Sequence, residues 1–266
     1  MLREIFIHDG RLTCFDAGKG PVLLLVHGFP LDHRMWSSQL AALAGECRVI
    51  APDLRGFGRT APALAIHDEL TMEHQADDLA ELITALAPNE PVTFCGLSMG
   101  GYIAWQFWKK HRAKLARLIL CDTKAAADSA EAAKGRHDTA GRVLKEGTGF
   151  LVESMMPKLL AEETRKNRPE IVAAMKEMMS AASPDGVAAA LKGMAARPDM
   201  SNWLPQIDVP TLVICGAEDV ITPAKEMRPM AEKIPGAKYV EIAAAGHMSP
   251  LEKPDEVNAA IRAFMK

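Results

Sequence analysis

The sequence lacks the long apolar segments that a membrane protein requires. Its longest aliphatic run is Val22–Val26, whereas a membrane-spanning helix needs about 20 apolar residues. Residues 1–9 also lack the apolar stretch of about 7–15 residues that marks a secretory signal peptide. We therefore expect a cytoplasmic protein with no membrane partner.

Closely spaced cysteines are missing as well. The chain has 5 cysteines, and no two of them form a C-x-x-C pair, so neither a zinc knuckle nor a dithiol redox site is indicated. Three of them, Cys95, Cys121 and Cys215, fall inside apolar runs. Free cysteine in such a setting behaves as a small hydrophobic residue, and we interpret these thiols as structural.

The chain also has no excess of positive charge. It carries 31 basic and 34 acidic residues, a formal net charge of −3, which provides no basic surface for nucleic acid. The H-E-x-x-H, G-x-G-x-x-G and P-loop motifs are absent. We therefore expect no nucleic-acid partner, no metal and no organic cofactor.

Short apolar runs that alternate with helical patterns dominate the 266 residues. A period-2 pattern at 4–8 and 12–15 predicts an N-terminal hairpin. Buried parallel strands are predicted at 22–26, 48–51, 92–95, 118–121, 212–215 and 239–242. Helices are predicted at 33–44, 71–87, 98–111, 223–234 and 250–264. This alternation indicates an α/β fold with a doubly wound sheet. Ser249, Pro250 and Glu252 match a helix capping box.

Residues 124–203 interrupt the alternation. They contain no strand-like run, and eighty residues are far more than the 2–6 of a usual strand-to-helix connection. We predict a helical insertion there, with 1–123 and 204–266 forming the core. The insertion holds 7 of the 15 methionines. We take Met155, Met178 and Met179 as candidate substrate-pocket residues, with plain core packing as the alternative.

The strongest chemical signal is Gly96-Leu97-Ser98-Met99-Gly100, which lies between a predicted strand and a predicted helix. A serine at such a turn points its hydroxyl out of the sheet, because the flanking glycines remove side chains that would collide. The following helix N-terminus favours an anion nearby. Ser98 is therefore the candidate nucleophile, and a helix N-cap serine is the alternative reading.

A serine hydroxyl needs a base to act as a nucleophile. His247 lies between the last predicted strand and the final helix, at the sheet edge where α/β proteins bind ligands. His33, together with most of the other histidines, is expected to be exposed. The imidazole also needs a carboxylate. Asp219 follows the preceding strand and is the preferred candidate, with Asp122 and Glu218 as rivals.

A tetrahedral intermediate needs two hydrogen-bond donors for its negative oxygen. We predict the backbone N–H groups of Phe29 and Met99 for this oxyanion hole. His27, which precedes Phe29 by two residues, is interpreted as a structural hydrogen-bonding residue. Asp53 and Arg55 are interpreted as a structural ion pair beside the site.

These pieces resemble the α/β-hydrolase superfamily, whose signature includes the serine elbow and the order serine, acid, histidine. The resemblance rests on His27-Gly-Phe-Pro30, Asp53-Leu-Arg-Gly-Phe-Gly58, the Ser98 elbow, Asp219 and Gly246-His247. It implies a mostly parallel eight-stranded sheet flanked by helices, with residues 124–203 as a helical cap. A serine at the elbow separates the chain from dehalogenases and epoxide hydrolases of this superfamily, which use aspartate there.

The pattern is similar to small carboxylesterases and to 3-oxoadipate enol-lactonase. The resemblance therefore implies a carboxylic-ester hydrolase acting on small to medium acyl substrates, with a small-molecule ester or lactone as its partner. Lactonase, cofactor-free perhydrolase and carbon–carbon bond hydrolase activities remain alternatives on the same residues. A non-catalytic ligand-binding protein is a more distant alternative, since fold does not determine function. The pattern indicates no oligomeric state.

Overall fold

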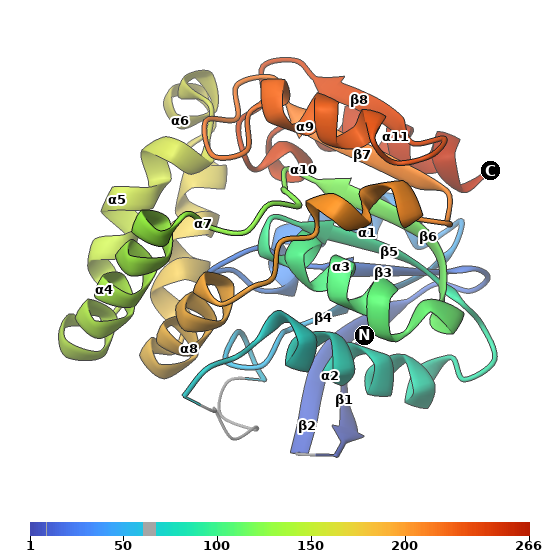
Figure 1. Ribbon diagram of the computed structural model, residues 1–266, viewed down its shortest axis with the longest axis horizontal. Helices are drawn as coiled ribbons and strands as arrows, with labels where there is room; N and C mark the ends of the chain where they lie inside the picture. The colour runs from blue at the N-terminus through green and yellow to red at the C-terminus, as the bar shows by residue number, and fades with distance from the viewer. Residues whose placement is uncertain (9, 61–67) are drawn as a thin grey trace.

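The computed structural model describes residues 1–8, 10–60 and 68–266. Its centre is a single eight-stranded sheet with the strand order β1-β2-β4-β3-β5-β6-β7-β8 (Figure 1). The strands are β1 (Leu2–Ile7), β2 (Gly10–Ala17), β3 (Val22–Val26), β4 (Arg48–Pro52), β5 (Val92–Leu97), β6 (Leu115–Cys121), β7 (Thr211–Gly216) and β8 (Lys238–Ile242). Only β2 pairs antiparallel with both of its neighbours. The expected mostly parallel sheet is therefore confirmed.

Helices cover both faces of the sheet, which explains why the central strands are apolar throughout. One face packs against α2 (Met72–Leu86), α3 (Met99–Lys110) and α9 (Ala224–Glu232), and the other against α1 (Ser37–Leu43) and α11 (Pro254–Met265). Successive side chains of a strand point to opposite faces. Leu24 of β3 accordingly lies in the first apolar cluster, whereas Leu23 and Leu25 lie in the second.

Five helices follow β6 and form the insertion, which lies beyond one end of the sheet at the left of Figure 1. They are α4 (Ala130–Glu146), α5 (Gly149–Leu159), α6 (Glu162–Asn167), α7 (Pro169–Ala181) and α8 (Pro184–Ala195). Helix α8 meets the core without intervening side chains. A Cβ built on Gly186 would lie 2.1 Å from the Gly56 carbonyl oxygen, and one on Gly193 would lie 1.7 Å from that of Leu70. Only glycine allows this approach.

A buried ion pair joins the two ends of the insertion. Asp128, just before α4, accepts hydrogen bonds from Arg136 at 2.5 Å and from Arg197 at 2.8 Å. The Asp128 and Arg197 side chains are only 1% and 3% exposed. The Arg197 guanidinium also lies 4.2 Å from the centre of the Tyr102 ring. Because Tyr102 belongs to α3, this cluster ties the insertion to the core.

Two helix predictions need correction. The segment predicted as one helix at 33–44 begins with a 3₁₀ turn, His33–Trp36, before α1. The segment predicted at 250–264 is divided into α10 (Ser249–Glu252) and α11. The division falls at Lys253, which precedes Pro254 and leaves helical geometry with ψ of 63°, because the proline ring disfavours helical geometry in the residue before it.

The predicted capping box is wrong. The N-cap of α10 is Met248 and makes no side-chain cap. The Ser249 and Glu252 side chains instead form hydrogen bonds with other segments of the chain. The Ser249 hydroxyl donates to Asp122 at 2.5 Å, and the Glu252 carboxylate accepts from two backbone N–H groups of other segments.

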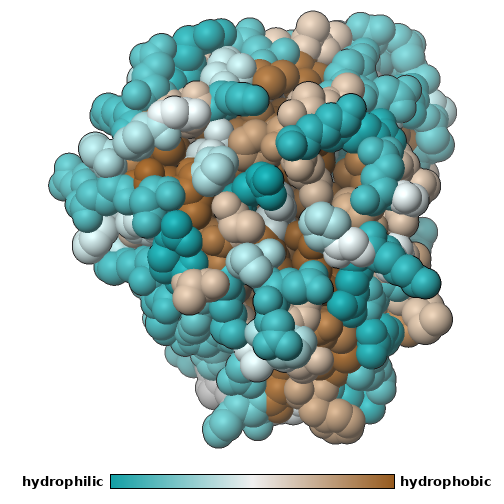
Figure 2. Space-filling view, turned by 90° about the vertical axis from the view of Figure 1, so that its right-hand side faces the viewer, coloured by the Kyte–Doolittle hydropathy of each residue, from teal (hydrophilic) through white to brown (hydrophobic). Residues whose placement is uncertain are grey.

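The described residues include no helix long and apolar enough to cross a membrane. The face turned away from the insertion mixes hydrophilic residues with apolar areas (Figure 2). All five cysteines are free and buried, as expected for Cys95, Cys121 and Cys215.

Candidate active site

The turn between β5 and α3 holds Ser98 in a backbone conformation that non-glycine residues rarely adopt. Its φ is 52° and its ψ is −109°, which costs on the order of 1–3 kcal/mol and persists only where the surroundings enforce it. The Ser98 N–H donates to the Cys121 carbonyl at 3.0 Å, and the Ser98 carbonyl accepts from the Thr123 hydroxyl at 2.8 Å. Two bonds, one to the last residue of β6 and one to the segment just after it, therefore hold the turn in place.

Glycines make this turn sterically possible. A Cβ built on Gly96 would lie 2.3 Å from the Gly100 carbonyl oxygen, and one on Gly100 would lie 2.4 Å from that of Val26. No side chain fits at such distances. The Ser98 side chain forms no cap on α3, so the alternative reading as an N-cap serine does not describe its contacts.

The Ser98 hydroxyl meets His247 instead. Ser98 Oγ lies 2.9 Å from His247 Nε2, and His247 Nδ1 lies 2.8 Å from Asp219 Oδ2. The sheet explains this convergence, because Asp219 follows β7 and His247 follows β8, and the two strands pair in parallel. Both side chains are almost completely buried, at 0% and 3% exposure.

Asp219 is held as an ionised acceptor. Burial alone would raise its pKa, but hydrogen bonds and charge from His247, together with bonds from Thr222, lower it below the usual range. Its Oδ1 accepts from the backbone N–H groups of Ile221 and Thr222, at 2.7 and 3.0 Å, and its Oδ2 accepts from the Thr222 hydroxyl at 2.6 Å. Thr222 was not anticipated from the sequence. Its position three residues after an aspartate, a common local turn arrangement, was the available signal.

The two rival acids have other surroundings. Glu218 is exposed. Asp122 is buried, but its Oδ1 accepts from the Gly216 N–H at 2.7 Å and its Oδ2 is bonded to the Ser249 hydroxyl. Burial and the nearby negative charge of Asp219 raise the pKa of Asp122 well above its usual value. The structure therefore brings Asp219, and neither rival, to the His247 ring.

The predicted oxyanion donors belong to two segments that adjoin Ser98. Met99 is the first residue of α3. Gly28, which precedes Phe29, backs onto the turn, and a Cβ built on it would lie 3.5 Å from the Ser98 Cβ. In the described part of the chain, neither the Phe29 N–H nor the Met99 N–H donates a hydrogen bond to another protein group. Their role as oxyanion donors stays a prediction.

His27 has the structural role expected for it. Its Nδ1 lies 2.9 Å from the Gly28 carbonyl, and its Nε2 accepts from the Leu54 N–H at 3.0 Å. Burial lowers the pKa of His27, so the ring is held neutral. The bond to Leu54 connects the loop before Phe29 to the segment that follows β4.

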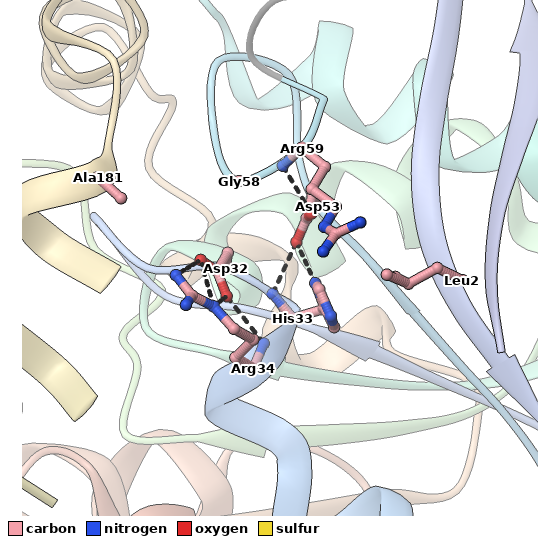
Figure 3. Close-up of a pocket in the computed structure, with 8 residues that line it drawn as sticks. All are labelled: Leu2, Asp32, His33, Arg34, Asp53, Gly58, Arg59 and Ala181. Atoms are coloured by element: carbon pink, nitrogen blue, oxygen red, sulfur yellow. Dashed lines mark hydrogen bonds and ion pairs between the residues drawn. The ribbon is translucent and has the colours of Figure 1, made fainter. Parts of the chain in front are cut away.

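The expected ion pair between Asp53 and Arg55 is wrong, and so is the expected exposure of His33. Arg55 pairs with Asp78 of α2 through two hydrogen bonds of 2.8 and 2.9 Å. Asp53 instead accepts from the His33 ring at 2.7 Å and from the backbone N–H groups of His33 and Arg59 (Figure 3). His33 is buried there, beside a polar pocket of about 270 Å³.

Two groups of side chains within the described ranges have the spacing of metal ligands. They are Asp32, His33 and Asp53, and Asp122, Cys215 and Asp219. Their carboxylate oxygens already accept hydrogen bonds from protein N–H and O–H donors. This use of the lone pairs does not fit a cation, which needs them itself. The absence of a metal and of an organic cofactor stays a prediction.

The candidate pocket methionines occupy two environments. Met155 lines a pocket of about 540 Å³ between α4, α5 and the core, together with Phe29, Leu151 and Leu191. Met178 and Met179 are 4% and 0% exposed and belong to the apolar cluster between α5, α7 and the core. Their assignment to a substrate pocket stays a prediction, and the packing alternative describes the observed burial of Met178 and Met179.

The mostly parallel sheet, the serine turn after β5 and the helical insertion after β6 define a protein of the α/β-hydrolase type. A family model described as alpha/beta hydrolase fold matches residues 21–254, and the chain belongs to that family.

Among solved structures, a thermophilic esterase from Thermogutta terrifontis is 46% identical, with a TM-score of 0.94 over 100% of this chain and 98% of that one. An enol-lactonase from Burkholderia xenovorans LB400 is 28% identical, with a TM-score of 0.90 over 99% of both chains. Among curated proteins, 3-oxoadipate enol-lactonase 2 of Acinetobacter baylyi is 26% identical over 95% of this chain and 91% of its own length. The expected likeness to esterases and enol-lactonases is thereby confirmed.

Proposed function

We propose that the protein is a serine hydrolase that cleaves carboxylic esters of small to medium acyl substrates through an acyl-enzyme intermediate. The observation that carries this proposal is the chain of contacts Ser98 Oγ, His247 Nε2 and Asp219 Oδ2, with distances of 2.9 and 2.8 Å. This is the geometry of a nucleophile, a general base and the group that orients the base. The 46% identity to an esterase supports the choice of substrate class.

The reaction begins when Ser98 Oγ attacks the ester carbonyl carbon and its proton passes to His247 Nε2. Asp219 stays ionised and stabilises the imidazolium, while the N–H groups of Phe29 and Met99 bind the oxyanion. The intermediate collapses, the bond from the carbonyl carbon to the alcohol oxygen breaks, and the alcohol leaves with the proton from His247. An acyl group now occupies Ser98.

Hydrolysis of the acyl-enzyme follows the same steps, with water as the nucleophile. His247 takes a proton from a water molecule as its oxygen attacks the acyl carbon, and the second tetrahedral intermediate forms. The bond to Ser98 Oγ then breaks, the acid leaves, and His247 returns the proton to Ser98. Water is the only co-reactant, and no metal or organic cofactor takes part in either half.

Lactone hydrolysis is the second candidate, and the likeness to two enol-lactonases favours it. A lactone is a cyclic ester, so the same bonds form and break, but the alcohol stays attached to the acyl group. Perhydrolysis and carbon–carbon bond cleavage have no comparable support from the site.

A series of p-nitrophenyl esters of increasing acyl length, with simple lactones beside it, tests the proposal. We expect turnover in the wild type and its loss in Ser98→Ala, by about 10⁴-fold or more. Ser180→Ala, which changes an exposed serine of α7, is the matched control and should retain wild-type rates. Turnover of lactones but of no ester would select the second candidate. A wild type that hydrolyses neither class and takes up no fluorophosphonate at Ser98 would exclude serine hydrolysis.

A further inference from the structure

A second buried carboxylate, Glu252, contacts the loop that carries His247. Glu252 is 2% exposed. Its Oε1 accepts a hydrogen bond from the Gly246 N–H at 2.9 Å, and its Oε2 accepts one from the Ala161 N–H at 2.9 Å. Gly246 is the residue before His247, whereas Ala161 precedes α6 in the insertion. One carboxylate therefore joins the loop that carries His247 (the base loop) to the helical insertion α4–α8 (the cap).

The contact around Glu252 is made largely by backbone. A Cβ built on Gly246 would lie 2.7 Å from the Ala161 nitrogen, so the two segments meet with no room for a side chain. The Met248 N–H, on the other side of His247, donates to the Leu159 carbonyl at 3.2 Å. The base loop therefore packs directly against the connection between α5 and α6.

The Thr164 side chain extends this link into α6. Thr164 is 5% exposed, and hydrogen bonding from its side chain lowers the pKa of Glu252, whereas burial raises it more strongly. Within the described ranges no lysine, arginine or histidine forms an ion pair with Glu252. A buried carboxylate needs such donors, because leaving it without them costs several kcal/mol. The Ala161 and Gly246 N–H groups are two such donors.

We propose that Glu252 is a positioning residue that couples the docking of the cap to the position of His247. Loosening its cap side, at Ala161 and Thr164, should release Gly246 and let the imidazole move away from Ser98. A misplacement of about 1 Å can cost about 10²-fold in rate. The Glu252 carboxylate bonds to Gly246 and Ala161 and not to the reacting atoms, so it acts only through the base loop. The inference rests on the proposed function, because it concerns the same base.

The test measures how fast a fluorophosphonate modifies Ser98, because this reaction needs the base but no knowledge of the natural substrate. The maximal rate constant kinact and the apparent binding constant KI are determined for the wild type, Glu252→Gln, Thr164→Val and the double variant. Glu256→Gln, an exposed carboxylate on α11, is the matched control. Thr164→Val replaces the hydroxyl by a methyl group of similar size, at a residue that forms no hydrogen bond with Ser98, Asp219 or His247.

We expect Glu252→Gln to lower kinact by about tenfold or more, with KI changed far less. Thr164→Val should lower kinact in the same direction by a smaller factor. The double variant should be no slower than Glu252→Gln alone, because both changes act through one carboxylate. Glu256→Gln should match the wild type.

Three results would overturn the coupling: a wild-type kinact in Glu252→Gln, a wild-type kinact in Thr164→Val, or independent effects that multiply in the double variant. A thermal melt of each variant accompanies the kinetics. If Glu252→Gln fails to fold, the kinact of Thr164→Val decides alone. Failure of the proposed function has a different signature, since the wild type itself would then remain unlabelled.

Discussion

Replacing Asp122 by asparagine tests whether the second acid beside the triad is neutral in the folded protein. Asp122 is fully buried, and its burial, followed by the negative charge of Asp219, raises its pKa well above the usual value. Asparagine has nearly the same shape as a protonated aspartate. Its carbonyl can accept from the Gly216 N–H and its amide can donate to the Ser249 hydroxyl, so both observed contacts have a counterpart.

The expected effect on stability follows from proton linkage. A carboxyl whose pKa is raised on folding contributes its full stability below its unfolded pKa of about 3.9, and loses it as the pH rises towards the folded pKa. The asparagine of Asp122→Asn does not titrate in this range, so the variant lacks this pH dependence. Relative to this variant, the wild type should therefore lose about 1.4 kcal/mol of unfolding free energy per pH unit across that window.

Chemical denaturation of both proteins at several pH values from 4 to 8 measures this slope. Asp138→Asn, which changes an exposed aspartate of α4, is the control and should show no comparable slope. A constant difference between the wild type and Asp122→Asn above pH 4 would show that Asp122 is ionised in the fold. We also expect Asp122→Asn to keep its esterase activity, whereas a loss near 10⁴-fold would make Asp122 the acid that supports the base.

Three further predictions concern the acid, the cap and the pocket. Asp219→Asn should lower kcat by about 10⁴-fold, and an unchanged kcat would remove Asp219 from the mechanism. Asp128→Asn should destabilise the protein by about 3–5 kcal/mol at pH 7, because it leaves the buried Arg197 without its partner. Burial raises the pKa of Asp128, but hydrogen bonds and charge from Arg197 and Arg136 outweigh it and lower the pKa below the usual value. The stability difference between the wild type and Asp128→Asn, measured by thermal melts, should therefore shrink as the pH falls below about 4. A difference that does not change with pH would show that the Asp128 carboxylate charge is not its cause. Met155→Trp should lower kcat/KM for long acyl esters by about tenfold or more relative to acetyl esters, and equal losses would place Met155 outside the acyl site.

The strand and helix pattern was predictable because it depends on local periodicity. The run Val22–Val26 is apolar on both faces and forms a central strand. The glycines around Ser98 indicated a tight turn, because the backbone segments there approach too closely for a side chain. The capping box failed for the opposite reason. Ser249 and Glu252 have the correct local spacing, but stronger partners from distant segments take their polar groups.

Pairing between side chains was the least predictable part. Asp53 and Arg55 are two residues apart, yet they point to different partners, His33 and Asp78. Sequence spacing says which residues are near along the chain, whereas an ion pair depends on which direction each side chain takes from its backbone. The same limit applies to Met178 and Met179, whose place in the methionine-rich insertion did not show whether their side chains face a pocket or the core.

The sequence by itself determined the fold class, the serine turn and the candidate nucleophile and base, since these follow from periodicity, glycine placement and the order of residues after strands. Only the tertiary structure decided between Asp219 and Asp122. Both follow buried strands, and the choice depends on β7 lying between β6 and β8, which brings Asp219 to His247 and leaves Asp122 bonded to Ser249 and Gly216. The link from Glu252 to the cap was likewise invisible in the sequence, because its donors at Ala161 and Gly246 are backbone groups, which every residue type except proline carries.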